Sequence, residues 1–249
     1  MPNLYVFDKD GTLVHPRNDG YVESPEDQVL YEGVRAKLDR LRAEGHLLAI
    51  ASNQCGCDYH EVGSERLSVG GSFAIQDDEG IFAGDFFTVL SIDTDDHGLI
   101  NIETSSQDFT FSKGERLLVQ YKTIEGAIAE MQFAADLCGI TVAYFAPTMN
   151  GDRCFHTYKK DGQWITLNFA VNDITENFRK PGPGMLTLAS LYAYCESEIQ
   201  FDRRIMIGDR DSDRQAAIAA GFEFMWAEDW RNNEEDDRSG ESPNAGDAA

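Results

Sequence analysis

The stretch that decides the fold is Leu4-Tyr5-Val6-Phe7-Asp8-Lys9-Asp10-Gly11-Thr12-Leu13. Its first four residues are an apolar run that stops abruptly at two acids and a glycine. Such a run indicates a buried parallel strand that delivers a polar loop. A solvated Asp-Gly turn is the ordinary alternative, but two acids directly after a buried run argue against it. We therefore expect Asp8 and Asp10 at the carboxyl end of a central strand.

The same alternation continues along the chain. Apolar runs that predict further strands lie at residues 47–51, 140–145, 204–208 and 222–226, and helical spacing or composition predicts helices at 28–44, 123–138, 185–194 and 213–220. Strands separated by helices imply an α/β fold with a doubly wound, Rossmann-like parallel sheet, whose ligands bind at the carboxyl ends of the strands. Residues 153–168 predict a hairpin, because Asp161 and Gly162 divide two β-like runs.

The sequence pattern changes between residues 61 and 119, where short β-like runs are separated by Gly, Asp and Ser turns. This pattern predicts an inserted small β module, a candidate cap over the site. We expect an α/β core at residues 1–60 and 120–227 and a disordered acidic tail at residues 228–249.

Composition narrows the function. The chain has 249 residues and a formal net charge of −23, which disfavours binding along a nucleic-acid backbone but suits cations. Five sparse cysteines argue against a disulfide framework. No run approaches the roughly 18 apolar residues of a membrane span, and the first residues carry no signal pattern. We expect a cytoplasmic protein without membrane contact; oligomeric state is not readable.

Polar side chains gather where the predicted strands end. They are Asp8, Asp10, Ser52, Asn53 and Asp209, together with Asp213 in a helix start and Lys180 in the loop before a helix. Clustered carboxylates repel one another unless a hard cation neutralises them, and Mg²⁺ prefers such oxygen ligands. The set therefore predicts a phosphoryl-transfer site that uses Mg²⁺.

Four segments carry a family resemblance: residues 7–13, Ser52-Asn53-Gln54, Arg179-Lys180-Pro181 and residues 208–213. In their residue types and their order along the chain, these segments resemble the haloacid dehalogenase (HAD) superfamily of phosphatases. Within it they are most similar to the HAD-IIIA branch, which holds histidinol-phosphate and heptose bisphosphate phosphatases and a polynucleotide 3′-phosphatase domain. The resemblance does not cover the β module.

The resemblance implies roles for these residues. Asp8 would be the nucleophile that forms an aspartyl phosphate, and Asp10 the general acid and base. Asp8, the Asp10 backbone carbonyl and Asp209 would hold Mg²⁺, supported by Asp213. Ser52 and the Asn53 backbone would bind phosphoryl oxygens, Lys180 would neutralise both nucleophile and phosphoryl group, and Thr12 would orient Asp10 by a hydrogen bond.

Plainer interpretations stand beside these roles. Asp213 could serve only the helix dipole, Ser52 could be a helix cap, and Lys180 a surface lysine. Lys9, Arg179 and Arg210 are interpreted as surface charges within reach of substrate. A structural zinc site from Cys55, Cys57, Cys154 and His156 is a further alternative, although packed cysteines are favoured over it.

The expected substrate is a small phosphorylated metabolite, either a sugar phosphate or an amino-alcohol phosphate. A polynucleotide 3′ end held in a local pocket is the alternative substrate. A non-catalytic regulatory protein that binds phosphate is an alternative of another class.

Overall fold

The computed structural model describes residues 1–18, 22, 24–54, 56–67, 69–70, 72–75, 86–174, 176–197 and 200–233. Within these residues the main sheet consists of β1 (Leu4–Phe7), β4 (Leu47–Asn53), β11 (Val142–Ala146), β12 (Arg153–Lys160), β13 (Gln163–Ala170), β14 (Arg204–Gly208) and β15 (Glu223–Trp226). Their spatial order is β13-β12-β11-β4-β1-β14-β15. The pairs from β11 to β15 are parallel, whereas β12 and β13 form the predicted hairpin as an antiparallel edge. The doubly wound α/β class is confirmed.

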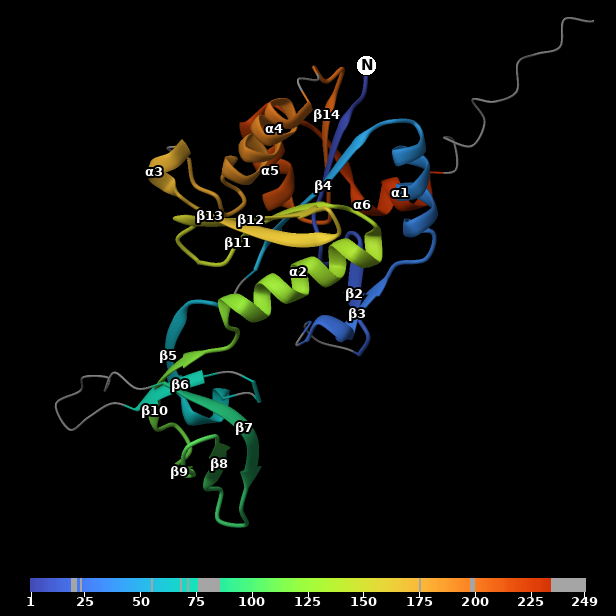
Figure 1. Cartoon of the computed structure of the whole chain (residues 1–249). Coiled ribbons are helices and arrows are strands. Elements are labelled where there is room, and N and C mark those ends of the chain that lie inside the picture. Colours follow the sequence, from blue (N-terminus) through green and yellow to red (C-terminus); the bar gives the residue numbers. More distant parts are fainter. Residues whose placement is uncertain are drawn as a thin grey trace, which may run out of the picture.

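Helices cover both faces of the sheet (Figure 1). One face packs against α1 (Val34–Ala43), α2 (Ile124–Cys138) and α6 (Ala227–Asn232), and the other against α4 (Gly184–Ser197) and α5 (Asp211–Ala220). Strand alternation explains this division, because Phe7 belongs to the first apolar cluster and its neighbour Val6 to the second. A short helix, α3 (Val171–Ile174), follows β13.

The prediction of a helix over residues 28–44 is wrong in its N-terminal part. The helix α1 begins at Val34, and residues 28–30 form β3 (Gln28–Leu30), which pairs with β2 (Val14–Pro16) after the 3-10 turn η1 (Pro25–Asp27). Gly33 adopts a left-handed φ of 74° at the N-cap of α1. The apolar spacing of Val29 and Leu30 therefore serves a strand.

The predicted start of the disordered tail at residue 228 is also wrong, because α6 occupies the residues up to Asn232. Its Trp230 is buried and packs against Phe7, with 5.0 Å between the ring centroids. The burial of this indole gives the segment a reason to fold. The rest of the predicted tail, residues 234–249, lies outside the described residues.

A second, antiparallel sheet occupies residues 59–120, where the sequence predicts the β module. Its strands are β5 (Tyr59–Gly63), β6 (Ser72–Ile75), β7 (Phe87–Thr94), β8 (Ile100–Thr104), β9 (Phe109–Phe111) and β10 (Arg116–Gln120), with the 3-10 turn η2 (Ser64–Arg66) after β5. They pair in the order β5-β10-β6-β7-β8-β9 around their own apolar cluster, which includes Phe73, Val89 and Leu117. We call residues 59–120 the insert. Figure 1 shows it projecting from the core beyond the carboxyl end of β4.

Among the helices that the structure describes, none is both long and apolar enough to cross a membrane.

Candidate active site

The site lies where β1, β4 and β14, three neighbouring strands, end at the same edge of the sheet. Asp8 follows β1, Ser52 and Asn53 close β4, and Asp209 follows β14. Asp213 lies in the first turn of α5, and Lys180 lies in the loop before α4. Parallel strands bring their carboxyl ends together, which explains how residues far apart in sequence reach one place.

Lys180 is the centre of the cluster. Its Nζ lies 2.5 Å from Asp8 Oδ1 and 2.6 Å from Asp213 Oδ1, and it donates to the backbone carbonyl of Ala51 at 2.8 Å. The residue is only 4% exposed, so the interpretation of Lys180 as a surface lysine is wrong. Three acceptors around one ammonium match its three donors.

Asp213 both supports a helix start and faces the site. Its Oδ2 accepts a hydrogen bond from the Arg210 backbone N–H at 3.0 Å, while Oδ1 contacts Lys180. A Cβ at Gly208 would overlap this carboxylate, so the end of β14 must be bare backbone for Asp213 to fit. The helix-dipole interpretation alone does not account for these contacts.

Three carboxylates are arranged as a cation site would require. Asp8, Asp209 and Asp213 each offer an oxygen, and these oxygens lie within 4.8 Å of one another. Against one ammonium, from Lys180, the three carboxylates leave a local charge of about −2, which a divalent cation would balance. The donor set, all oxygen, fits the preference of Mg²⁺. The Asp10 carboxylate is not part of this group.

Burial sets the protonation of these groups. It raises the pKa of Asp8 from 3.8 to about 7, opposed by Lys180 and reinforced by the charges of Asp213 and Asp10. Burial alone would lower the pKa of Lys180, but Asp8 and Asp213 outweigh it and raise that pKa. Burial also raises the pKa of Asp209, against the opposing charge of Arg210. A bound cation would favour the ionised carboxylates.

The Asp10 carboxylate contacts two side chains outside this group. Its Oδ2 accepts a hydrogen bond from Gln54 Nε2 at 3.2 Å, and its Oδ1 lies 3.0 Å from Lys9 Nζ. The predicted hydrogen bond from Thr12 is absent, because the Thr12 hydroxyl is buried and has no partner among the residues that the structure describes. Gln54 and Lys9 orient Asp10 instead.

Ser52 and Asn53 join the end of β4 to the neighbouring loops. The Ser52 hydroxyl accepts from Gln54 Nε2 at 3.0 Å, so one amide bridges Ser52 and Asp10. The Asn53 side chain exchanges two hydrogen bonds of 2.9 Å with the backbone of Lys180. Both residues therefore fix the loops that carry Asp10 and Lys180.

The sequence pattern does not predict the buried side chains beside Asp10, and the interpretation of Lys9 as a surface charge is wrong. Lys9 is fully buried, with Gln28 and Glu130 as further partners. A signal was present in α2, because Glu130 shares the core-facing helical spacing of Ala127 and Ala134. A carboxylate on a buried helix face calls for a buried cation.

The zinc alternative does not assemble in the part of the chain that the structure describes. Cys57 packs in the apolar cluster beneath α1 and α2, whereas Cys154 packs in the cluster on the opposite face of the sheet. Cys55 lies outside the described residues. Among those described, the grouping of potential metal ligands is that of Asp8, Asp209 and Asp213.

One family model matches the C-terminal part of the chain. Residues 177–245 match the family model described as HAD-hydrolase-like, a segment that contains Lys180, Asp209 and Asp213. A comparison with curated protein sequences finds no match.

Solved structures that resemble the chain include the D,D-heptose 1,7-bisphosphate phosphatase of B. bronchiseptica, complexed with magnesium and phosphate. It is 15% identical, with a TM-score of 0.46, over 90% of this chain and 79% of that one. A HAD-like phosphatase from Mesorhizobium loti is also 15% identical, with a TM-score of 0.45, over 89% of this chain and 69% of that one. Residues 177–245 of the chain are therefore similar to the HAD-hydrolase-like family, and this segment holds two of the three clustered carboxylates, Asp209 and Asp213.

Proposed function

We propose that this protein is a Mg²⁺-dependent phosphomonoester hydrolase that works through an aspartyl-phosphate intermediate on a small phosphorylated metabolite. The observation that carries the proposal is the contact of one buried ammonium, Lys180 Nζ, with both Asp8 and Asp213 beside the Asp209 carboxylate. A buried carboxylate that can share its charge with a lysine and a cation can approach a phosphate dianion.

The reaction would have two halves. In the first, an Asp8 carboxylate oxygen attacks phosphorus, the bond from phosphorus to the ester oxygen breaks, and Asp10 gives its proton to the departing alkoxide. In the second, Asp10 takes a proton from water, whose oxygen attacks the aspartyl phosphate and releases inorganic phosphate and free Asp8. Lys180 offsets negative charge in both halves.

The carboxylates of Asp8, Asp209 and Asp213 and the Asp10 backbone carbonyl are the proposed Mg²⁺ ligands, with Asp213 acting directly or through water. When bound, the cation would supply charge neutralisation and polarise a phosphoryl oxygen. In this proposal the Ser52 hydroxyl and the Asn53 backbone N–H would donate hydrogen bonds to the remaining phosphoryl oxygens.

The first test is hydrolysis of p-nitrophenyl phosphate with and without Mg²⁺. Asp8→Asn should reduce kcat by at least about 1,000-fold, because the amide is no nucleophile, while the thermal unfolding curve stays cooperative. Asp211→Asn is the matched control, since Asp211 is an exposed acid of α5 that pairs with Arg214. Retained activity in Asp8→Asn would refute the nucleophile.

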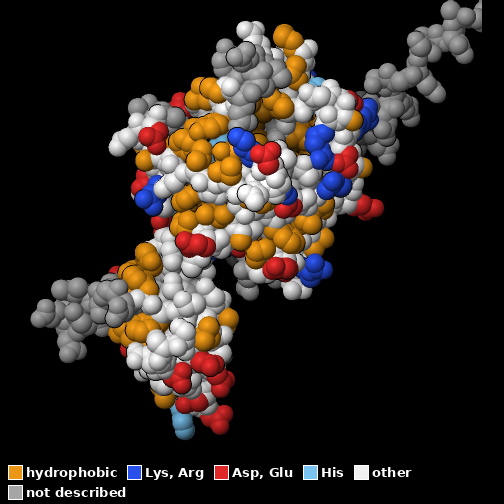
Figure 2. Space-filling model, viewed as in Figure 1, with side chains coloured by type: hydrophobic (Ala, Val, Ile, Leu, Met, Phe, Trp, Pro, Cys, Tyr) orange, Lys and Arg blue, Asp and Glu red, His pale blue; other side chains and the backbone are white. Residues whose placement is uncertain are grey.

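Charge supports the small substrate. Exposed acids such as Asp93, Asp96 and Glu103 gather over the far end of the insert (Figure 2), in a chain of net charge −23. This field opposes a polynucleotide. A panel of histidinol phosphate, heptose bisphosphate, nucleoside monophosphates and a 3′-phosphorylated oligonucleotide should show the highest kcat/KM for a small ester. Preference for the oligonucleotide by orders of magnitude would overturn this part of the proposal.

A further inference from the structure

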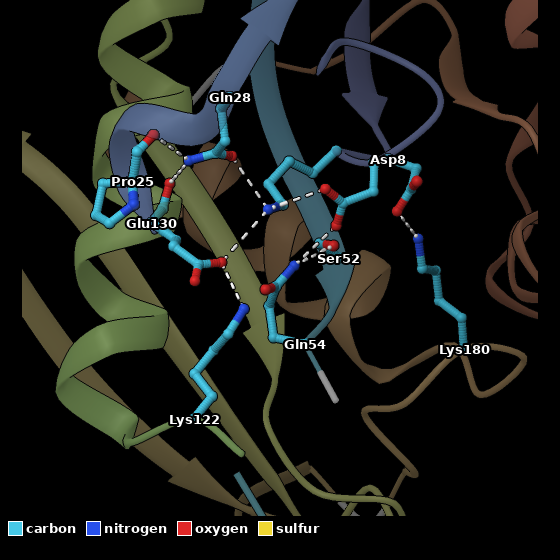
Figure 3. A network of polar contacts seen from close by, with 10 residues as sticks. Asp8, Pro25, Gln28, Ser52, Gln54, Lys122, Glu130 and Lys180 are labelled. Atoms are coloured by element: carbon cyan, nitrogen blue, oxygen red, sulfur yellow. Dashed lines mark hydrogen bonds and ion pairs between the residues drawn. The ribbon is translucent and has the colours of Figure 1, made fainter. Parts of the chain in front are cut away.

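A network of buried polar side chains adjoins Asp10, and Figure 3 labels its members Gln28, Glu130 and Lys122. Lys9 has no exposed surface, and its Nζ lies 3.0 Å from Asp10 Oδ1 and 3.8 Å from Glu130 Oε2, and donates to Gln28 Oε1 at 3.1 Å. A buried ammonium is strongly unfavourable unless such partners surround it. Lys9 therefore has a fixed place, and so does the Asp10 oxygen that it contacts.

The network continues through Glu130 to Lys122. Glu130 is 2% exposed, and its Oε2 also lies 2.6 Å from Lys122 Nζ. The order of charges is Asp10, Lys9, Glu130, Lys122, alternating in sign and summing to zero. Gln28 locks the middle of this chain, because its Nε2 donates to the Glu130 backbone carbonyl at 3.1 Å while its Oε1 accepts from Lys9.

The far end of the network lies at the base of the insert. Lys122 lies two residues after the end of β10 and two residues before the start of α2, so it is on the segment by which the chain returns from the insert. Its backbone N–H donates to the carbonyl of Gly56, on the segment by which the chain leaves the core. Both connections to the insert thus meet at Lys122, two ion pairs away from Lys9.

We infer that Lys9, Glu130 and Lys122 are positioning residues that hold the Asp10 carboxylate for proton transfer and link its position to the base of the insert. The inference rests on the proposed function, in which Asp10 is the general acid. The network ends on the Asp10 side chain, which is 39% exposed and can therefore meet a substrate, whereas Lys9 and Glu130 are buried.

Leaving-group dependence separates positioning from stability. Phenolate is a much poorer leaving group than p-nitrophenolate, so phenyl phosphate depends more on the proton from Asp10. The kcat/KM value reports the steps up to departure of the leaving group. Asp10→Asn is the reference variant. Its kcat/KM should fall about 100-fold for phenyl phosphate and less than about tenfold for p-nitrophenyl phosphate.

Lys9→Met and Glu130→Gln should show the same pattern. Their kcat/KM should fall about tenfold for phenyl phosphate and stay unchanged for p-nitrophenyl phosphate. Lys122→Met should lower kcat/KM for phenyl phosphate about threefold, and should have no further effect in an Asp10→Asn background, since interacting residues are not additive. Lys122→Arg should restore the wild-type ratio. The matched control is Lys159→Met, which breaks another ion pair to α2, the one with Asp136 at 2.7 Å. This variant should change kcat/KM for neither ester by more than about twofold.

Equal losses for both esters, or none, in Lys122→Met and Glu130→Gln would overturn the inference. The same holds if Lys122→Met lowers the ratio of the two esters in an Asp10→Asn background as much as in the wild type. If Lys9→Met does not fold, the partly exposed Lys122 still decides the matter. Failure of the wild-type protein to hydrolyse either ester would refute the proposed function instead, so the two failures are distinguishable.

Discussion

At the scale of single residues, the site depends on a position without a side chain. Gly11 has a φ of 80°, and a Cβ there would overlap the Asp209 carboxylate. The loop after β1 thereby packs directly against the end of β14. Gly33 has a similar φ of 74°, but a Cβ there would meet nothing within 4 Å.

These two glycines make a matched pair for a prediction. Gly33→Ala should lower the free energy of unfolding by about 1 kcal/mol, because alanine is strained in the left-handed region. Gly11→Ala carries the same strain and also displaces Asp209, so it should raise the Mg²⁺ concentration for half-maximal activity about tenfold, an estimate based on one perturbed ligand. Metal titrations of p-nitrophenyl phosphate hydrolysis and urea unfolding measure both effects. Equal metal dependence in the two variants would contradict the assigned role of Asp209.

At the scale of elements, the strands whose apolar pattern is local can be predicted from the sequence, whereas those defined by pairing with a distant segment cannot. The strands that end at Asp8, Ser52 and Asp209 were predictable, since their apolar runs are buried on both faces. Residues 28–30 were not, because their spacing fits a helix until pairing with β2 is known. The burial of Lys9 depends on Glu130, which lies on another element, so no local pattern contains it.

The strand β12 places a histidine where an ionised side chain is unfavourable. His156 is 1% exposed, its ring centroid lies 4.5 Å from that of Tyr144 and 4.4 Å from that of Tyr192, and neither ring nitrogen has a hydrogen-bond partner among the described residues. Burial lowers its pKa from 6.5 to about 4. The folded protein therefore keeps His156 neutral at a pH where the unfolded chain binds a proton.

The sign of the pH effect follows from this difference. The stability that neutral His156 contributes is complete above about pH 6.5 and is lost as the pH falls toward 4, with about 2 kcal/mol lost by pH 5. His156→Phe should remove that loss, so its unfolding free energy should fall less than that of the wild type between pH 7.5 and 5 in urea titrations. His97→Asn, at an exposed turn of the insert, is the control and should keep the wild-type slope. An identical slope in His156→Phe would contradict the prediction.

At the scale of the whole molecule, the core and the insert are packed separately. The insert has an apolar cluster of its own, and Phe73 at its centre contacts Phe109 and Phe111 edge to face at 5.3 and 5.5 Å. The core clusters contain no residue of β5 to β10. The two parts meet through polar contacts, such as Gln120 Nε2 donating to the Cys57 carbonyl at 2.7 Å.

This separation predicts that the core folds without the insert. Tyr59 and Gln120 are cross-strand partners, so replacing residues 60–119 by Asn-Gly, a tight hairpin turn, should close the chain and leave the Gly56 and Lys122 connection in place. The shortened protein should unfold cooperatively within a few degrees of the wild-type core and should still hydrolyse p-nitrophenyl phosphate. Its preference among the panel substrates should weaken if the insert selects the substrate as a lid. A control with Asn-Gly added in the exposed turn between β7 and β8 should behave as wild type, whereas failure of the shortened chain to fold would make the insert part of the core.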